Sequence, residues 1–490
     1  MKIRPIISST LCMLMLVAGS VGCAPKRVDP TLSRAPQQPN PDGARALLRS
    51  GGDTADWGLA LSGGGLRAAL FGIGVMKALY DAGVLQKVDA ISSVSGGGYA
   101  SMWLYRKQNA EPSAAGGFGS SALDDGVFAK SLCELEEEGN FHPYGVIVAN
   151  LRGGSFAGYE RSLNRTFGVD TSASMPIHAL RAMIDRGDAP QFIHNATLAD
   201  TAQLAPVRFD NIVEMTSWYI GNPRFGYHEW EREPARAPRW SEAVTTAAAA
   251  LRPLSHRIHW PTSTLGDSVL LWDGGKSENL AAFALIRRRM PNVVIVDAEH
   301  DPEYAFEGYE RLKHLLPAYG LSMAVEDIDR HLGNRDKDLP HTRAYASGPV
   351  SIGAVRAILP DGSVGPVTST IHYIKLSVSR AVQEKMQDSA LIVAGVAYDE
   401  KLEAANSCEA KASVAGGFDP KSFVYEVSDY WQWSRGQSRI SWATRKLPVL
   451  RSKAARYEFP QTTTLDQSFF MDQTDAFIGL GYLQASTHRW

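Results

Sequence analysis

The sequence predicts an α/β protein, a three-layer α/β/α sandwich with a mostly parallel central sheet. Two successive strand-turn-helix patterns lie near its front, one over Trp57–Gly83 and one over Val88–Tyr105. Two more apolar strands, Leu270–Trp272 and Val293–Asp297, are separated by a helical pattern at about 280–290. This alternation of strands and helices is typical of parallel sheets whose two faces are covered by helices.

Each element follows from its own residues. Gly58–Leu61 is a short apolar strand, and the apolar residues after it recur at helical spacing until Gly83. Val88–Val94 is the second strand, and a helical pattern follows it. The run 241–251 contains four consecutive alanines and predicts a helix that a proline ends.

The bulk composition describes an ordinary globular protein. The chain has 490 residues, of which 44% are hydrophobic and 21% charged, with a net charge of −2. A near-neutral balance without a basic excess excludes the usual signature of a nucleic-acid partner.

The first residues resemble an export signal. Lys2 and Arg4 precede an apolar stretch over 6–18, and small residues then lead into Cys23. The stretch is too short to span a bilayer, so we expect a signal peptide over 1–22 rather than a buried N-terminal helix.

Cys23 follows the small residues as the acylated cysteine of a bacterial lipobox does, although Ser20 stands where that motif usually has Leu. We therefore expect a lipidated N-terminus and a flexible, proline-rich tether over 23–53. Ala24 is not the Asp associated with inner-membrane retention. The expected location is the bacterial cell envelope, as an outer-membrane lipoprotein, with a periplasmic or secreted protein as the alternative.

Export changes the cysteine inventory. Cys12 would leave with the signal peptide and Cys23 would be lipidated, which leaves Cys133 and Cys408. In an oxidising compartment these two could form a disulfide, and two separately buried thiols remain an equal alternative.

The strongest chemical pattern joins the first two turns. Gly63, Gly64 and Gly65 follow the first strand, and Ser95 follows the second in Ser-Val-Ser-Gly-Gly, which is close to the G-x-S-x-G nucleophile elbow. Ser93 replaces the first glycine of that motif. Because consecutive parallel strands end at the same edge of a sheet, the bare amides would lie beside Ser95. That arrangement is an oxyanion hole next to a nucleophile.

The glycine run has a second interpretation. Residues 63–68 also satisfy G-x-G-x-x-A, the fingerprint of a dinucleotide-binding turn. That interpretation requires a carboxylate at the end of the second strand to hold a ribose. This strand ends in serines and glycines, which favours a hydrolase.

A candidate base ends a later strand. Asp273 follows the apolar Leu270–Trp272 and precedes two glycines, so it could meet Ser95 at the sheet edge; the alternative is a turn or helix-capping aspartate. The histidines His256, His259 and His300 are typical of loop or core positions, and no H-E-x-x-H zinc pattern is present. We expect neither a metal nor a cofactor.

Taken together, these motifs resemble the patatin-like and cytosolic phospholipase superfamily, and the resemblance extends over nearly all of the chain from Trp57 onward. It rests on Ser62–Ala68, the Ser95 elbow, Asp273-Gly-Gly275, Asn195-Ala-Thr197, Glu278-Asn-Leu280 and the carboxyl-terminal segments 348–375 and 459–482. Two positions depart from it: Ser62, where plant patatins carry Asp, and Ser93 in the elbow.

The resemblance implies one catalytic domain over 54–490, with core motifs in 57–300 and a carboxyl-terminal extension over 301–490. It implies a Ser-Asp dyad in which Asp273 takes the proton of Ser95. The amides of Gly64 and Gly65, helped by Gly63 or Gly96, would hold the oxyanion. Arg67 would bind a lipid phosphate or pair with a carboxylate at the helix start, and both alternatives stay open.

The leading hypothesis is a serine lipid acyl hydrolase, anchored to the membrane, that cleaves phospholipid or lysophospholipid esters through an acyl-enzyme. Two alternatives remain. One is a non-catalytic lipid-binding lipoprotein of the envelope, and the other is a Ser-His-Asp esterase in which His300 completes a triad.

Overall fold

The computed structural model describes residues 57–110, 117–138, 155–167, 175–199, 211–250, 254–262, 265–334, 348–414, 418–444, 459–461 and 471–490. The expected signal peptide, Cys23 and the tether lie outside the described residues.

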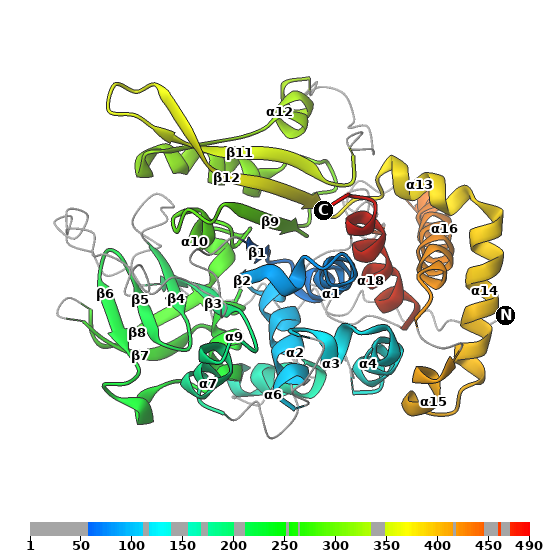
Figure 1. The fold of residues 1–490 in the computed structure, drawn as a ribbon, viewed down its shortest axis with the longest axis horizontal. Coiled ribbons are helices and arrows are strands. Elements are labelled where there is room, and N and C mark those ends of the chain that lie inside the picture. The colour runs from blue at the N-terminus through cyan, green and yellow to red at the C-terminus, as the bar shows by residue number, and fades with distance from the viewer. Residues whose placement is uncertain are drawn as a thin grey trace.

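A twelve-stranded sheet forms the centre of the molecule (Figure 1). Its strand order is β10-β11-β12-β9-β1-β2-β3-β4-β5-β6, and β8 pairs with both β3 and β7. The five central strands, from β12 to β3, run parallel as predicted. The strands are β1 Trp57–Leu61, β2 Val88–Ser93, β3 Gln191–Leu198, β4 Ile212–Met215, β5 Tyr219–Asn222, β6 Gly226–Glu229, β7 His256–Thr262, β8 Gly266–Asp273, β9 Asn292–Asp297, β10 Leu321–Val325, β11 Ser351–Ile358 and β12 Val364–Lys375.

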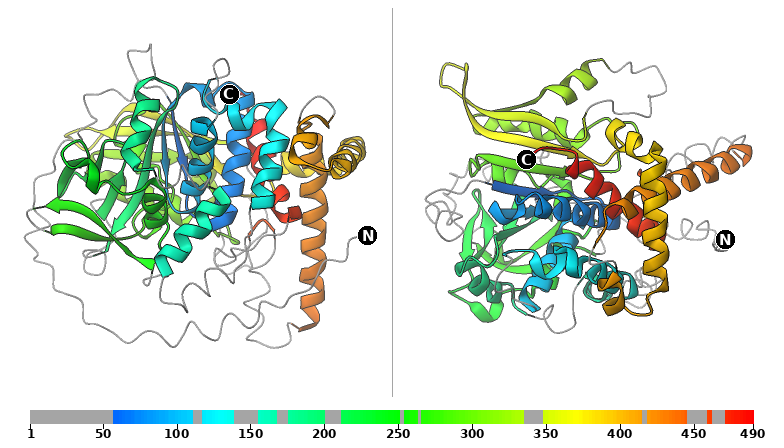
Figure 2. Two further views of the ribbon diagram at one scale, coloured as in Figure 1. Left: turned by 90° about the horizontal axis from the view of Figure 1, so that it is seen from below. Right: turned by 45° about the vertical axis from the view of Figure 1, so that its right-hand side comes forward.

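Helices cover both faces of this sheet, so the predicted α/β/α layering is confirmed (Figure 2). Alternate residues of one strand face opposite layers: Leu59 belongs to the core under α1, α2 and α18, and Ala60 to the core under α10, α11 and α12. The helices are α1 Gly65–Asp81, α2 Gly96–Ala110, α3 Ser120–Leu123, α4 Asp125–Glu138, α6 Ser155–Phe167, α7 Arg181–Asp185, α9 Trp240–Ala247, α10 Phe283–Ile286, α11 Glu307–Leu315, α12 Glu326–Gly333, α13 Arg380–Gln387, α14 Ser389–Ala404, α15 Cys408–Ala412, α16 Lys421–Thr444 and α18 Met471–Ser486.

The last helix, α18, packs closely on α1. A Cβ atom on Gly74 would lie 1.8 Å from the carbonyl oxygen of Ile478, and one on Gly481 would lie 2.1 Å from that of Phe71. Glycine is therefore required on both helices for their backbones to approach this closely. The contact fixes the helix that starts at the glycine run against the carboxyl end of the chain.

Antiparallel strands extend the sheet on both sides, which the sequence did not predict. Several of them, β4, β5, β6 and β10, have four or five residues, and strands this short produce weak periodicity. The helix expected over 241–251 ends at Ala247, and the carbonyl groups of Ala247 and Ala249 accept the N–H groups of Ser95 and Asp273.

A disulfide between Cys133 and Cys408 joins α4 to α15, which resolves the alternative that the sequence left open. None of the helices in the described ranges combines the length and the hydropathy that a bilayer-spanning segment needs.

Candidate active site

Ser95 lies on a strained turn between β2 and α2. Its φ angle is +49°, a left-handed conformation that is uncommon for a residue with a side chain and that recurs at functional sites. The turn is tight because two glycines follow it. A Cβ atom on Gly96 would lie 2.0 Å from the carbonyl oxygen of Gly65, and one on Gly97 would lie 2.2 Å from that of Leu61. The elbow therefore presses against the turn after β1.

Ser93, the residue that departs from the elbow motif, has a specific partner. Its hydroxyl lies 2.8 Å from His194 Nδ1, and Trp240 Nε1 donates to His194 Nε2 at 3.1 Å. An indole N–H only donates, so Nε2 accepts and Nδ1 carries the proton that is donated to Ser93. Burial lowers the pKa of His194 to about 3, which keeps the ring neutral. His194 could not be identified from the sequence, because a lone histidine in an apolar strand belongs to no motif.

The glycine run forms the loop between β1 and α1. Gly64 and Gly65 have φ angles of +146° and +66°, and a Cβ atom on Gly63 would lie 3.3 Å from that of Ser95. The Gly63 N–H donates to the carbonyl of Asn279 at 2.9 Å, so it is already used. Within the described ranges, no acceptor receives the N–H of Gly64, Gly65 or Gly96. These three amides are therefore available to an acceptor from outside the described part of the chain.

Arg67 points inward from the first turn of α1. The side chain is 1% exposed, and its Nε and Nη2 donate to the carbonyl of Ala298 at 3.2 and 3.0 Å. Burial lowers its pKa to about 10, partly opposed by the charges of Asp297 and Glu299. A lipid phosphate has no access to this guanidinium in the structure. Arg67 instead fastens the start of α1 to the end of β9.

Asp273 ends β8 and is 6% exposed. Its Oδ1 accepts from the N–H of Gly275 at 2.7 Å, and its carboxyl lies close enough to the Ser95 hydroxyl for that hydroxyl to lower its pKa. The side chain therefore lies near Ser95, as one interpretation of the sequence predicts. It also caps the short 3₁₀ helix Gly274–Lys276, as the other interpretation predicts. Burial raises the pKa of Asp273, opposed by the Gly275 N–H, the Ser95 hydroxyl and the charge of Lys276.

The strand that carries Asp273 reaches Ser95 from the opposite direction. β8 runs antiparallel to β3, with Ala196 opposite Asp273, and β3 extends past the end of β2. The alanine run after α9 then holds both turns: Ala247 O accepts from the Ser95 N–H at 3.3 Å, and Ala249 O from the Asp273 N–H at 3.2 Å. The sequence correctly predicted the edge of the sheet at which Asp273 lies. It could not show the direction of the strand that carries Asp273.

Two tyrosines complete the surroundings of the serine. The Tyr99 hydroxyl is hydrogen-bonded to the Tyr159 hydroxyl and lies near the Ser95 hydroxyl, and burial raises the pKa of both phenols. Tyr99 lies one helical turn after Ser95 on α2, a spacing that could have identified it. Tyr159 comes from α6, a helix that the sequence did not reveal.

Two of the three histidines singled out by the sequence are bound to glutamates elsewhere. His256 Nε2 lies 2.8 Å from Glu242 Oε1, and His259 Nε2 lies 2.5 Å from Glu233 Oε2. The Ser95 hydroxyl lowers the pKa of the Asp273 carboxyl, so these two side chains lie close together.

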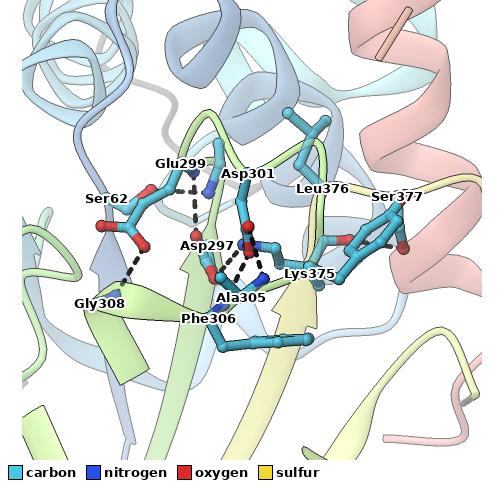
Figure 3. Close-up of polar contacts among 12 residues, drawn as sticks. Ser62, Asp297, Glu299, Asp301, Ala305, Phe306, Gly308, Lys375, Leu376 and Ser377 are labelled. Atoms are coloured by element: carbon cyan, nitrogen blue, oxygen red, sulfur yellow. Dashed lines mark hydrogen bonds and ion pairs between the residues drawn. The ribbon is translucent and has the colours of Figure 1, made fainter. Parts of the chain in front are cut away.

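A buried charge cluster supports the loop after β9 (Figure 3). Lys375 Nζ lies 2.8 Å from Asp297 Oδ2 and 3.0 Å from Asp301 Oδ2. Asp301 also accepts the N–H groups of Ala305 and Phe306 at 2.7 and 2.9 Å. The cluster holds the segment whose carbonyl group anchors Arg67.

No protein-family model matches the chain, and no curated protein matches it by sequence. Among solved structures, human GIVD cytosolic phospholipase A2 superposes with a TM-score of 0.53 at 14% identity, over 88% of this chain and 58% of that one. Its complex with methyl gamma-linolenyl fluorophosphonate superposes with a TM-score of 0.47 at 16% identity, over 93% and 61%. The likeness to the first is one of fold, and this chain spans less than two thirds of the human chain.

Proposed function

We propose that this chain is a serine lipid acyl hydrolase of the patatin-like type, which cleaves the carboxylic esters of phospholipids or lysophospholipids. The observation that carries the proposal is the placement of Ser95 beside the buried Asp273, whose pKa the Ser95 hydroxyl lowers, next to three amides with no protein acceptor among the described residues. A nucleophile, a base and oxyanion donors at one place are the requirements of acyl transfer.

The proposed reaction proceeds in two halves. Asp273 accepts the proton of Ser95 Oγ as Oγ bonds to the ester carbonyl carbon, and the oxyanion is held by the amides of Gly64, Gly65 and Gly96. The carbon–oxygen bond to the leaving alcohol then breaks, and that oxygen takes the proton from Asp273. Water repeats the sequence on the acyl-enzyme, releasing the fatty acid and restoring Ser95. Each oxyanion donor is worth about 3 kcal/mol of transition-state stabilisation.

Three observations support a lipid ester at an envelope membrane as the substrate. The fold is that of human cytosolic phospholipase A2. Residues 1–23 resemble an export signal that ends at an acylated cysteine. The Cys133–Cys408 disulfide fits an oxidising compartment outside the cytoplasm.

A fluorophosphonate probe tests the nucleophile. We expect wild-type protein to be labelled at Ser95 and to hydrolyse a fluorogenic acyl ester, and Ser95→Ala to lose both properties while remaining folded. Ser101→Ala is the matched control, because Ser101 is a buried serine on α2 whose hydroxyl has no hydrogen-bond partner within the described residues. Labelling that persists in Ser95→Ala, or an unlabelled wild type, would contradict the proposal and leave the non-catalytic lipid-binding alternative.

A second variant distinguishes the dyad from a triad. His300→Ala should keep most of the hydrolysis rate if Asp273 is the base. A Ser-His-Asp enzyme should lose roughly three to four orders of magnitude.

We also propose an outer-membrane lipoprotein acylated at Cys23. The expected result is incorporation of a palmitate analogue into the wild type and not into Cys23→Ser. A wild type that carries no label and behaves as a free periplasmic or secreted protein would refute the lipid anchor and support only the signal peptide.

A further inference from the structure

The most unusual cluster outside the candidate active site lies where two strand edges meet. Six strands follow one another in the order β7-β8-β3-β4-β5-β6. Among the described strands, β6 is hydrogen-bonded to β5 alone and β7 to β8 alone. The two outer strands nevertheless lie next to each other, at the left of the molecule in Figure 1. Two strand edges that face one another without hydrogen bonds between them need another interaction to hold them together.

His228, Glu233 and His259 occupy this junction. His228 lies on β6, His259 on β7, and Glu233 precedes the 3₁₀ helix Pro234–Arg236 that leads toward α9. One ligand-type atom from each of the three lies within 4.8 Å of those of the other two. The two imidazole rings meet edge to face with centroids 5.3 Å apart.

The polar atoms of this cluster are incompletely satisfied. His228 is 7% exposed, and its Nε2 has no hydrogen-bond partner among the described residues. His259 Nε2 contacts Glu233, while its Nδ1 is also buried without a hydrogen bond in the described part of the chain. A buried imidazole nitrogen without a partner costs free energy, and such an atom is explained when it binds an ion.

We propose that His228, Glu233 and His259 form a zinc site that joins the edges of β6 and β7. Two imidazole nitrogens and one carboxylate oxygen are a recurrent zinc donor set, with the fourth position left to water. Zinc–ligand distances of about 2.0–2.2 Å place the ligand atoms of a tetrahedral site roughly 3.4 Å apart. The side chain of Glu233 is half-exposed, and its Oε2 lies 2.5 Å from His259 Nε2, so zinc would enter by separating these two atoms.

The surrounding charges favour a cation. Asp267 Oδ2 lies 3.6 Å from His259 Nδ1, on the side of the ring away from Glu233. A carboxylate at that position orients a metal-bound histidine and raises its basicity. Arg232 is the opposing positive charge near His228, and the two carboxylates outnumber it. Nitrogen donors favour zinc over magnesium or calcium.

The metal would stabilise the part of the molecule that positions the base. β7 continues through a hairpin into β8, which ends at Asp273. Glu233 precedes the segment that enters α9, whose last carbonyls hold the Ser95 and Asp273 turns. A clamp between β6 and β7 therefore fixes both segments at their origin without contacting the candidate active site.

Metal binding to the full mature chain tests this inference without reference to hydrolysis. The purification tag is removed, the protein is treated with a chelator, one equivalent of ZnCl₂ is added, and zinc is counted by mass spectrometry after desalting. We expect about one zinc per wild-type chain, a higher Tm with zinc than without, and no displacement by excess Mg²⁺. Co²⁺ in place of zinc should give the visible absorption of a four-coordinate site.

Two ligand variants and one control complete the test. His228→Gln and the more exposed Glu233→Gln should each weaken zinc binding about a hundredfold or more and abolish the zinc-dependent rise in Tm. His314→Gln, which changes an exposed histidine on α11, should bind zinc as the wild type does. A wild type that retains no zinc, or zinc bound equally well by Glu233→Gln and a folded His228→Gln, would overturn the proposal.

Discussion

Asp273 and Asp297 are the last residues of their strands, and both are buried, yet their surroundings are opposite. Asp297 receives Lys375 Nζ, the Tyr373 hydroxyl and the Glu299 N–H at 2.8, 2.6 and 3.0 Å. Asp273 accepts one backbone N–H and lies beside the Ser95 hydroxyl, and the positive charge acting on it belongs to the exposed Lys276. A buried carboxylate with a buried cation is a structural group, whereas one that contacts a hydroxyl without such a cation remains basic.

Removing the charge of each aspartate in turn tests whether the two have different roles. We expect Asp273→Asn to lower kcat/KM for an acyl ester by roughly four orders of magnitude, because the base is lost while the shape remains. Its stability at neutral pH should match or exceed that of the wild type. Burial raises the pKa of Asp273, so its ionised form opposes folding. Steady-state kinetics and thermal unfolding measure the two effects, and an active Asp273→Asn would refute the dyad.

Asp297→Asn should have the converse effect. Removing one member of a buried ion pair leaves Lys375 under-compensated, so the free energy of unfolding should fall by about 3 kcal/mol while hydrolysis by the folded protein is largely kept. Asp185→Asn, which breaks an exposed ion pair with Arg181, is the control and should cost no more than about 1 kcal/mol. Denaturant unfolding decides the matter: equal losses in the two variants would mean that the buried cluster is not a structural group.

The sequence could identify these two aspartates only as strand ends. Local patterns predicted the parallel β1 and β2 units, the Ser95 elbow and the edge at which Asp273 lies, because those features depend on neighbouring residues. The cation that distinguishes Asp297 is Lys375, 78 residues away in the chain. Contacts at that separation depend on strand order, which periodicity does not encode. The antiparallel approach of β8 and the contribution of Tyr159 were missed for the same reason.

The contacts of Arg67 and Gly63 could not be predicted from the motif that contains them. Both belong to the glycine motif, and both are used internally: the guanidinium by the Ala298 carbonyl, and the Gly63 amide by the Asn279 carbonyl. Their partners come from distant loops. A motif therefore indicates which residues matter, and the tertiary contacts decide whether each one faces the substrate or the core.

Tyr99 tests how the groups around Ser95 and Asp273 act together. Its hydroxyl shares the Ser95 side chain with Asp273, so Tyr99→Phe should leave the serine less well oriented and lower kcat/KM about tenfold, the value of one hydrogen bond of about 1.4 kcal/mol. Tyr105→Phe is the matched control, since Tyr105 is a buried tyrosine on the same helix whose hydroxyl donates to Pro190 O instead. A similar loss of activity in both variants would point to packing rather than to the Ser95 contact.

The pH dependence should separate the two aspartate environments within one protein. Asp273 must be ionised to accept a proton, and its pKa is raised above 3.8, so kcat/KM should fall as the pH drops through that raised value. Asp301 of the Lys375 cluster has its pKa lowered below 3.8, mainly by the charge of Lys375 acting against burial. Its contribution to stability is present above 3.8 and is lost only at lower pH. Activity should therefore be halved, reversibly, at a pH where circular dichroism still reports folded protein. Simultaneous loss of activity and structure would contradict this separation.

The smallest expected effect comes from Lys276, the positive charge that opposes the raised pKa of Asp273. Lys276→Met removes that charge, so the pKa of Asp273 should rise further and the acid limb of kcat/KM should move to higher pH. The Lys276 side chain is exposed, so water screens the interaction, and at a fixed pH on the limb we expect about a twofold loss. The shift should shrink as salt shortens the Debye length from about 10 Å at 0.1 M ionic strength. Lys385→Met, a change on the distant α13, controls for net charge. If the limb does not move at low salt, or if Lys385→Met moves it equally, the group that titrates on the limb is not Asp273.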